Sequence, residues 1–123
     1  MLQKELVRQL AALKNSLNAF KKILRHEKAF QAELFIFSPL FVFLMFASHI
    51  MIFERLLLLG SLFAVLICEI LNTAVEATVD NISLEHRELS KLAKDLGSLA
   101  VTISILFSGI CWVIIVLVPI IYL

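Results

Sequence analysis

The chain has 123 residues, of which 61% are hydrophobic, and its mean hydropathy is +0.98. A water-soluble domain of this length would not carry so large an apolar share, so a soluble globular protein is excluded. The net charge of +1 gives no indication of a nucleic-acid partner, and the charged residues are grouped between long apolar runs, which is typical of a small membrane protein with several spans.

Residues 3–26 are expected to form an amphipathic helix. Apolar side chains recur at steps of three and four residues, which places them in one continuous stripe along a helix. These side chains are Leu6, Leu10, Leu13, Leu17, Phe20 and Leu24. Such a helix can lie in a membrane interface or pack against a partner helix. The interface is favoured because the basic residues on its other faces would meet anionic headgroups.

Three membrane spans are expected to follow, at residues 34–53, 55–80 and 94–122. Each is predominantly apolar and long enough to cross a hydrocarbon core of about 30 Å. A short connection near the junction of the first two spans is bracketed by Ser48-His49 and Glu54-Arg55, and a longer polar loop occupies residues 81–93. Together with the N-terminal helix, these spans form one membrane domain over residues 1–123.

Basic residues near the ends of the spans predict the orientation in the membrane. Seven of them precede the first span, three lie between the second and third spans, and Arg55 alone lies on the other side. This distribution places the N-terminus and residues 81–93 in the cytoplasm and the C-terminus on the opposite side. Arg55 is expected to anchor its helix at that far membrane edge, and a contact with a substrate is also possible.

The second span carries a polar stripe. Glu69, Asn72, Glu76 and Asp80 are spaced by three, four and four residues, so their side chains share one face of an α-helix. Carboxylates in an apolar segment are costly, and they often mark functional sites. Polar contacts between helices would produce the same spacing, so the spacing alone does not choose between the two. Because Glu69 and Asn72 would otherwise face lipid, a homo-oligomer is expected.

Acidic groups are concentrated near the predicted cytoplasmic edge, and two charged residues begin the third span on the same side. The acidic residues are Glu27, Glu69, Glu76 and Asp80, and the third span begins with Lys94 and Asp95. Carboxylate oxygens and substrate phosphates are ligands that Mg²⁺ prefers. The sequence contains no glycine-rich phosphate-binding loop. Residue types and spacing therefore lead as far as a small oligomeric membrane protein with an acidic cluster.

The motif E-x-x-N-x-A-x-E-x-x-x-D at residues 69–80, followed by A-K-D at residues 93–95, closely resembles the signature of the prokaryotic diacylglycerol kinase family. Glu27, Glu33 and the charged N-terminal helix also look like this family, and the resemblance covers essentially the whole chain. The segment E-H-R-E-L-S at residues 85–90 is more similar to the Gram-negative diacylglycerol kinase branch than to the undecaprenol kinase branch.

The resemblance implies an all-α membrane protein, with an N-terminal amphipathic surface helix and three transmembrane helices in a homotrimeric bundle. It also implies active sites that are shared between subunits. The implied enzyme lies in a bacterial inner membrane, with its C-terminus in the periplasm. It would use ATP and Mg²⁺ to phosphorylate the primary hydroxyl of diacylglycerol, giving phosphatidic acid.

The same resemblance implies roles for individual residues. Glu69 would be the catalytic base that takes the proton from the lipid hydroxyl, and Glu27 and Glu76 would hold the Mg²⁺. The residues expected to bind ATP are Arg8, Glu27, Glu76, Glu85, His86, Arg87, Lys94 and Asp95. Those expected to bind the lipid are Arg8, Phe30, Glu33, Glu69, Ser98 and Trp112, with Arg55 as a further candidate. Asn72 and Asp80 would orient or support this set.

Two other functions remain open from the sequence. An undecaprenol kinase of the same family would share the core motif. A protein of another class, a non-catalytic membrane oligomer whose acids form an ion path or assembly contacts, would also explain a polar stripe inside a span.

Overall fold

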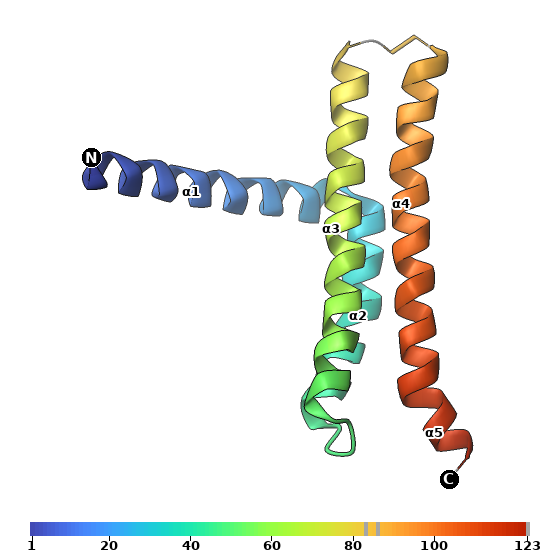
Figure 1. Ribbon diagram of the computed structural model, residues 1–123. Coiled ribbons are helices and arrows are strands. Elements are labelled where there is room, and N and C mark those ends of the chain that lie inside the picture. Colours follow the sequence, from blue (N-terminus) through green and yellow to red (C-terminus); the bar gives the residue numbers. More distant parts are fainter. Residues whose placement is uncertain (83, 86, 123) are drawn as a thin grey trace.

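The computed structural model describes residues 1–82, 84–85 and 87–122, and nearly all of them are helical (Figure 1). The helices are α1 (Leu2–His26), α2 (Lys28–Phe46), α3 (Ile52–Ile82) and α4 (Glu88–Trp112), and α4 continues through a π-helical segment, η1 (Val113–Leu117), into α5 (Val118–Ile121). Within these ranges no residue lies in a β-strand, which confirms the expected all-α class.

Three helical segments are long and apolar enough to cross a membrane, as the sequence predicted. They are Lys28–Phe46, Ile52–Ile82 and Glu88–Ile121. Helices α3 and α4 pack against each other along their length, and α2 packs against α3 (Figure 1). Helix α1 projects sideways from this bundle at the level where α2 begins, and both α3 and α4 continue beyond that level toward the connection between them.

The bounds of the helices differ from those of the expected spans. Helix α2 begins at Lys28 and ends at Phe46, so residues 47–53 of the expected span 34–53 lie beyond this helix. Helix α4 begins at Glu88 instead of residue 94. The helices extend past the apolar runs because polar residues that face water can still complete helical turns. Glu88 is also favourable in the first turn of α4, where a negative charge meets the positive end of the helix dipole.

The early end of α2 has a specific cause in the first turn of α3. The Arg55 guanidinium donates hydrogen bonds to the carbonyl oxygens of Leu44, Ala47 (2.8 Å) and Ile50 (3.4 Å). These bonds give donors to carbonyls past the last full turn of α2, and at Ala47 the guanidinium adds to the bond from the Ile50 N–H. Residues 47–51 therefore form a turn, and Arg55 holds that turn closed.

Arg55→Ala is expected to lower the free energy of unfolding by about 2 kcal/mol, because it removes charged hydrogen bonds and leaves carbonyl oxygens without donors. The measurement is denaturant unfolding of the protein in detergent micelles. Arg25→Ala, at an exposed arginine of α1, is the control and should change stability by less than about 0.5 kcal/mol. Equal effects from the two variants would show that the turn does not depend on Arg55.

A single residue, Glu27, connects α1 to α2. Its backbone N–H donates to the carbonyl of Ile23 at 2.9 Å. The corner is further held by the Gln31 amide, which donates to the carbonyl of Leu24 at 2.9 Å, and by an edge-to-face contact of Phe20 with the buried Phe30, whose ring centroids are 6.1 Å apart. The corner thus fixes Glu27 where the sideways helix meets the bundle.

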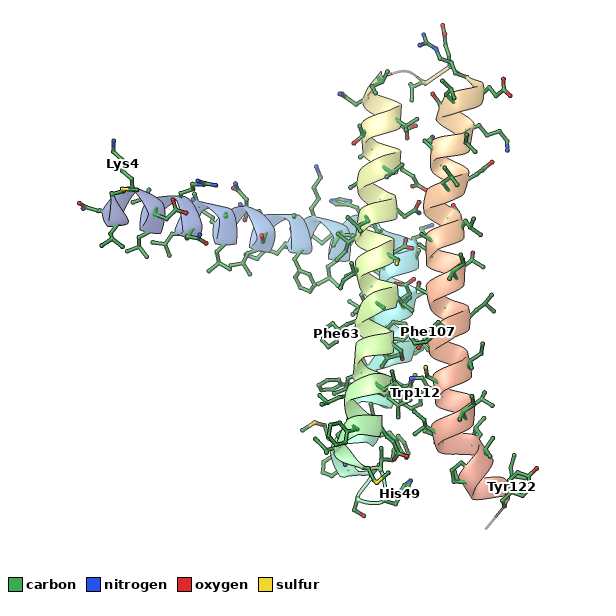
Figure 2. All side chains as sticks on the ribbon, in the orientation of Figure 1. Lys4, His49, Phe63, Phe107, Trp112 and Tyr122 are labelled. Atoms are coloured by element: carbon green, nitrogen blue, oxygen red, sulfur yellow. The ribbon has the colours of Figure 1, made fainter. Side chains whose placement is uncertain are left out.

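Helix α1 keeps its apolar stripe exposed in the single chain, so the stripe is free to meet either of the expected neighbours, a membrane interface or a partner helix. The leucines of the stripe are 39–61% exposed. Lys4 points toward the end of the molecule that carries the α3–α4 connection (Figure 2).

The contact between α3 and α4 contains small polar residues. The hydroxyl groups of Ser61 and Ser108 lie 2.9 Å apart and are both buried, and Ser104 is buried on the same side of α4. Small residues allow helices to approach closely inside a membrane, and their hydroxyl groups bond across the interface. This packing directs one face of α3, including Glu69 and Asn72, toward the interior of the bundle.

Candidate active site

Four carboxylates come together where α1, α2 and α3 meet. Glu69 is only 6% exposed, and its charge interacts with those of Glu76 and Glu27. Glu33, on α2, interacts with Glu69 in the same way. Glu69 and Glu76 are two helical turns apart on one face of α3, and the corner residue Glu27 brings the third charge from another element. Like charges in such a setting repel one another and favour the binding of a cation.

Two buried oxygen atoms of this region have no hydrogen-bond donor within the described ranges. They are Glu33 Oε2 and Asn72 Oδ1. Buried polar atoms are nearly always paired, so an unpaired acceptor calls for an explanation such as a bound group or a partner chain. The other end of the Asn72 amide is engaged, because its Nδ2 donates to Glu76 Oε1 at 3.3 Å. Asn72 therefore holds the Glu76 carboxylate.

A hollow of about 130 Å³ lies at the far end of α3 and α4, next to their connection. It is lined by Val79, Asp80, Leu84, Glu85, Arg87, Ser90, Lys91, Lys94 and Asp95. Four of the residues expected to bind ATP are therefore neighbours, whereas His86 lies outside the described residues. The hollow is smaller than a pocket that encloses a whole small molecule, so it can take only part of a nucleotide.

The charged side chains of the hollow pair with one another. Lys94 Nζ lies 2.5 Å from Asp80 Oδ1, which links α4 to α3, and Lys91 Nζ lies 2.6 Å from Asp95 Oδ2 within α4. Arg87 lies 3.5 Å from Glu85. All of these groups are partly or largely exposed, so the pairs add little stability and can exchange partners at low cost.

An apolar groove of about 340 Å³ runs between α2 and α3. Leu34, Phe37 and Phe41 line it from α2, and Leu59, Phe63 and Leu66 line it from α3. Leu34 directly follows Glu33 in sequence, and Leu66 lies one helical turn from Glu69, so the groove opens next to the acidic cluster. Its lining is suited to hydrocarbon chains.

Other residues expected at the site lie apart from it within this chain. Arg8 is an exposed residue of α1 that pairs with Glu5 at 3.7 Å, and it is about 28 Å along the helix from Glu27. Trp112 is about 27 Å along α4 from Lys94 and lies near Phe43, in the half of the bundle that contains the α2–α3 turn (Figure 2).

The remaining predicted residues are divided between the two ends of the bundle. Phe30 is buried at the α1–α2 corner, close to the acidic residues of that corner. Ser98 is exposed on α4, one turn beyond Lys94. Arg55 lies at the opposite end of α3 from the acidic cluster, where its guanidinium is bonded to the turn.

The structure adds one contact that the sequence analysis missed. A Cβ atom placed on Gly97 of α4 would collide with Asn72 Oδ1, so the two residues touch across the α3–α4 contact. Nothing in the local sequence around Gly97 signals this contact, because it depends on how two helices are rotated against each other. The Lys91–Asp95 pair, by contrast, has the i, i+4 spacing that a sequence can reveal.

The amino-acid sequence is similar to those of known diacylglycerol kinases. The family model described as Prokaryotic diacylglycerol kinase matches residues 14–116. The diacylglycerol kinase of Haemophilus influenzae is 39% identical over 99 residues, which cover 80% of this chain and 83% of the relative. The protein of the same name from Pseudomonas aeruginosa is 37% identical over 115 residues, covering 94% of this chain and 93% of the relative.

A shorter match with higher identity is found to the diacylglycerol kinase of Escherichia coli strain K12, which is 53% identical over 58 residues, or 47% of this chain and 48% of the relative. These matches confirm the resemblance seen in the motif, and they do not favour an undecaprenol kinase or a non-catalytic oligomer. The residue pattern, the three apolar helices and the sequence matches lead to the same conclusion: the chain is an enzyme of the prokaryotic diacylglycerol kinase family.

Proposed function

We propose that the chain transfers a phosphoryl group from ATP to the primary hydroxyl of diacylglycerol, giving phosphatidic acid, at the acidic cluster. One observation carries this proposal: the buried Glu69 lies on a membrane-crossing helix whose far end borders a charged hollow. A lipid hydroxyl at the bilayer edge and a nucleotide in water can therefore approach the same helix from two sides.

Glu69 is the proposed catalytic base. Its carboxylate accepts the proton of the lipid hydroxyl while that oxygen attacks the terminal phosphorus of ATP and the bond to the leaving diphosphate breaks. Phosphoryl transfer depends mainly on positioning and charge stabilisation. Burial of Glu69 between helices supports this role, because it keeps water away from the acceptor.

Glu27 and Glu76 are the proposed holders of Mg²⁺. Among the residues with described positions, no three acidic, histidine or cysteine side chains are grouped closely enough to hold a metal alone. Mg²⁺ commonly takes one or two carboxylates and completes its shell with water and substrate phosphates, so a pair of glutamates fits its chemistry. When bound, the ion would neutralise charge on the phosphates. Asn72 supports this pair through its bond to Glu76.

The charged hollow is the proposed site for part of the nucleotide. Lys94 is its main phosphate contact, and Asp80 keeps the lysine on the α3 side of the hollow until the nucleotide replaces it. Glu85, Arg87 and Asp95 lie in the same hollow, and Glu27 and Glu76 approach the phosphates from the acidic cluster.

The apolar groove between α2 and α3 is the proposed place for one acyl chain of the lipid. Phe30 and Glu33 precede Leu34 on α2, so they lie near the end of the groove that Leu34 lines, which supports contacts with the glycerol part of the substrate. Ser98 and Trp112 of α4 and Arg8 of α1 are proposed lipid contacts as well, and Arg8 would also reach ATP. A direct contact of Arg55 with the lipid is less favoured, because its guanidinium already holds the α2–α3 turn.

A homotrimer with shared active sites is the proposed assembly. Arg8 projects far from the acidic cluster of its own chain, so it could only contact a site that belongs to a neighbour. The proposed location is a bacterial inner membrane, with α1 on the cytoplasmic surface and the C-terminus in the periplasm. The basic residues before the first span and in the α3–α4 region support this orientation.

The proposed function is tested by giving the purified protein, in lipid nanodiscs, ATP and Mg²⁺ with either diacylglycerol or undecaprenol. Phosphatidic acid should form, and undecaprenyl phosphate should form much more slowly. The opposite preference would identify an undecaprenol kinase. Absence of both products, in protein shown to be folded by circular dichroism, would reject the kinase.

Lys94→Met is expected to raise the KM for ATP by about 10- to 100-fold, because it removes a charge-assisted hydrogen bond to phosphate. Lys91→Met, at the lysine one turn away whose side chain is 70% exposed, is the matched control and should change KM less than about threefold. Initial rates at saturating diacylglycerol and varied ATP measure both. If both variants raised the KM for ATP equally, the lysines of the hollow would act only through their positive charge, and Lys94 would have no specific contact with phosphate.

A further inference from the structure

We infer that Gly97 is a positioning residue for the proposed kinase: its missing side chain lets the Asn72 amide lie against α4 and hold the Glu76 carboxylate. The inference rests on the proposed function for its link to Mg²⁺, but the contact itself is a feature of the fold. Two features of the Asn72 amide group support it. Gly97 approaches this amide closely, and the Asn72 Oδ1 is buried without a hydrogen-bond donor among the described residues.

The orientation of the Asn72 amide follows from its neighbour on α3. Only the NH₂ group can donate to a carboxylate, so Nδ2 must face Glu76 Oε1, which lies 3.3 Å away. The carbonyl end then points toward α4. Asn72 is 9% exposed, and its Oδ1 is buried without a conventional donor among the residues that the structure describes.

Gly97 occupies the position that this carbonyl end faces. A Cβ on Gly97 would collide with Oδ1 and would lie 3.2 Å from the Asn72 Cγ. One hydrogen of the glycine Cα stands in the direction of that Cβ, so it faces the oxygen and gives it a weak Cα–H···O contact. The absence of a side chain at Gly97 therefore leaves space for the Asn72 amide, and Gly97 is the residue of α4 against which this amide packs.

A methyl group at position 97 would force the amide to rotate. Rotation would carry Nδ2 away from Glu76, which lies one helical turn further along α3 and is only partly buried. The Glu76 carboxylate would then lose the bond that orients it. Loss of a partner that orients a metal ligand commonly costs about 10- to 100-fold in metal affinity or activity.

The other two glycines of the chain serve as controls for the intrinsic effect of glycine. A Cβ at Gly60 on α3 or at Gly109 on α4 meets nothing within 4 Å. Gly109→Ala changes the same helix by the same methyl group, and it touches neither Asn72 nor the charged hollow. Alanine favours the helix more than glycine does, and this stabilising effect is the same in Gly97→Ala and Gly109→Ala. A difference between the two variants therefore comes from the contact with Asn72.

The geometry also supplies a variant that should remove the effect. Once the Asn72 amide is absent, the nearest atom left to a Cβ at position 97 is the Asn72 Cα, at 3.6 Å, which is an ordinary contact. An alanine at position 97 should therefore fit in a protein that already carries Asn72→Ala. If Gly97 acts through Asn72, the two substitutions will not be additive.

The experiment compares Gly97→Ala, Asn72→Ala, the double variant and Gly109→Ala. The first readout is the Mg²⁺ concentration that gives half-maximal phosphorylation of diacylglycerol. Gly97→Ala should raise it by about 10-fold, with little change in the KM for lipid. Asn72→Ala should raise it to a similar extent, the double variant should add no further loss, and Gly109→Ala should match the parent protein.

The second readout does not depend on activity. The side-chain NH₂ of Asn72 gives a pair of nuclear magnetic resonance signals, which should shift in Gly97→Ala and remain in place in Gly109→Ala. Additive losses in the double variant, a Gly97→Ala protein with the parent's Mg²⁺ response, or unmoved Asn72 signals would each overturn the inference.

Two further outcomes are separated by this design. If Gly97→Ala alone does not fold, the double variant should still fold and behave as Asn72→Ala does, and a double variant that is worse would overturn the inference. If the parent protein does not phosphorylate diacylglycerol, the proposed function fails, and the Asn72 signals still decide whether Gly97 positions the amide.

Discussion

Glu69→Gln is expected to lower the kcat for diacylglycerol phosphorylation by about 10³-fold, because it removes the proposed catalytic base while keeping the size of the side chain. The KM values for ATP and lipid should change much less. Initial rates in nanodiscs at saturating substrates measure this effect. The buried position of Glu69 between the helices makes the neutral amide easy to accommodate.

The same variant separates catalysis from assembly. As a base, Glu69 can be replaced by glutamine without loss of folding or oligomerisation, which size-exclusion chromatography with light scattering would show. If the carboxylate were mainly an assembly contact, the oligomer would dissociate instead. Glu54→Gln, also on α3 but at the turn with α2, is the matched control and should retain both activity and assembly.

Glu76→Gln is expected to raise the Mg²⁺ concentration for half-maximal activity by about 10- to 100-fold, because an amide oxygen is a weaker ligand for a hard cation than a carboxylate. Part of the lost rate should return at high Mg²⁺. This recovery distinguishes a metal ligand from a base, since added Mg²⁺ cannot replace a missing proton acceptor. Titration of Mg²⁺ at constant ATP measures it.

Glu27→Gln should resemble Glu76→Gln if both glutamates hold the ion. They come from different elements, one from the α1–α2 corner and one from α3, and both interact electrostatically with Glu69. Glu54→Gln, at the α2–α3 turn, again serves as the control for the general loss of negative charge. An unchanged Mg²⁺ response in Glu76→Gln would remove this residue from the metal site.

The site could be predicted in part because much of it is local. Glu69, Asn72 and Glu76 lie on one helix, so their spacing alone aligns them, and the structure confirms that the first two are buried. Lys91 and Asp95 pair at i, i+4 on α4. Such relations are set by the 3.6-residue repeat of the helix and need no knowledge of the neighbouring elements.

Relations between helices could not be predicted in the same way. The Lys94–Asp80 pair, the Ser61–Ser108 bond and the Gly97–Asn72 contact each join residues of α3 and α4. They require a particular rotation and height of one helix against the other, and many rotations would satisfy an apolar pattern equally well. The end of α2 was misjudged for a related reason. Apolar residues resume at Ile50 after Ser48 and His49, but the Arg55 guanidinium bonds to the carbonyls of Ala47 and Ile50 and holds this segment in a turn.

The sequence by itself determined the membrane class, the three spans, the amphipathic first helix and the family, because apolar runs, helical periodicity and a spaced motif are properties of the chain alone. Only the tertiary structure decided where the helices end, that Arg55 bonds to backbone carbonyls and Lys94 to Asp80, and that a glycine on α4 makes room for Asn72. The reason is physical. Helix formation depends on residues that are neighbours along the chain, whereas contacts between helices depend on how residues far apart in sequence pack together, and no short segment of sequence specifies that packing.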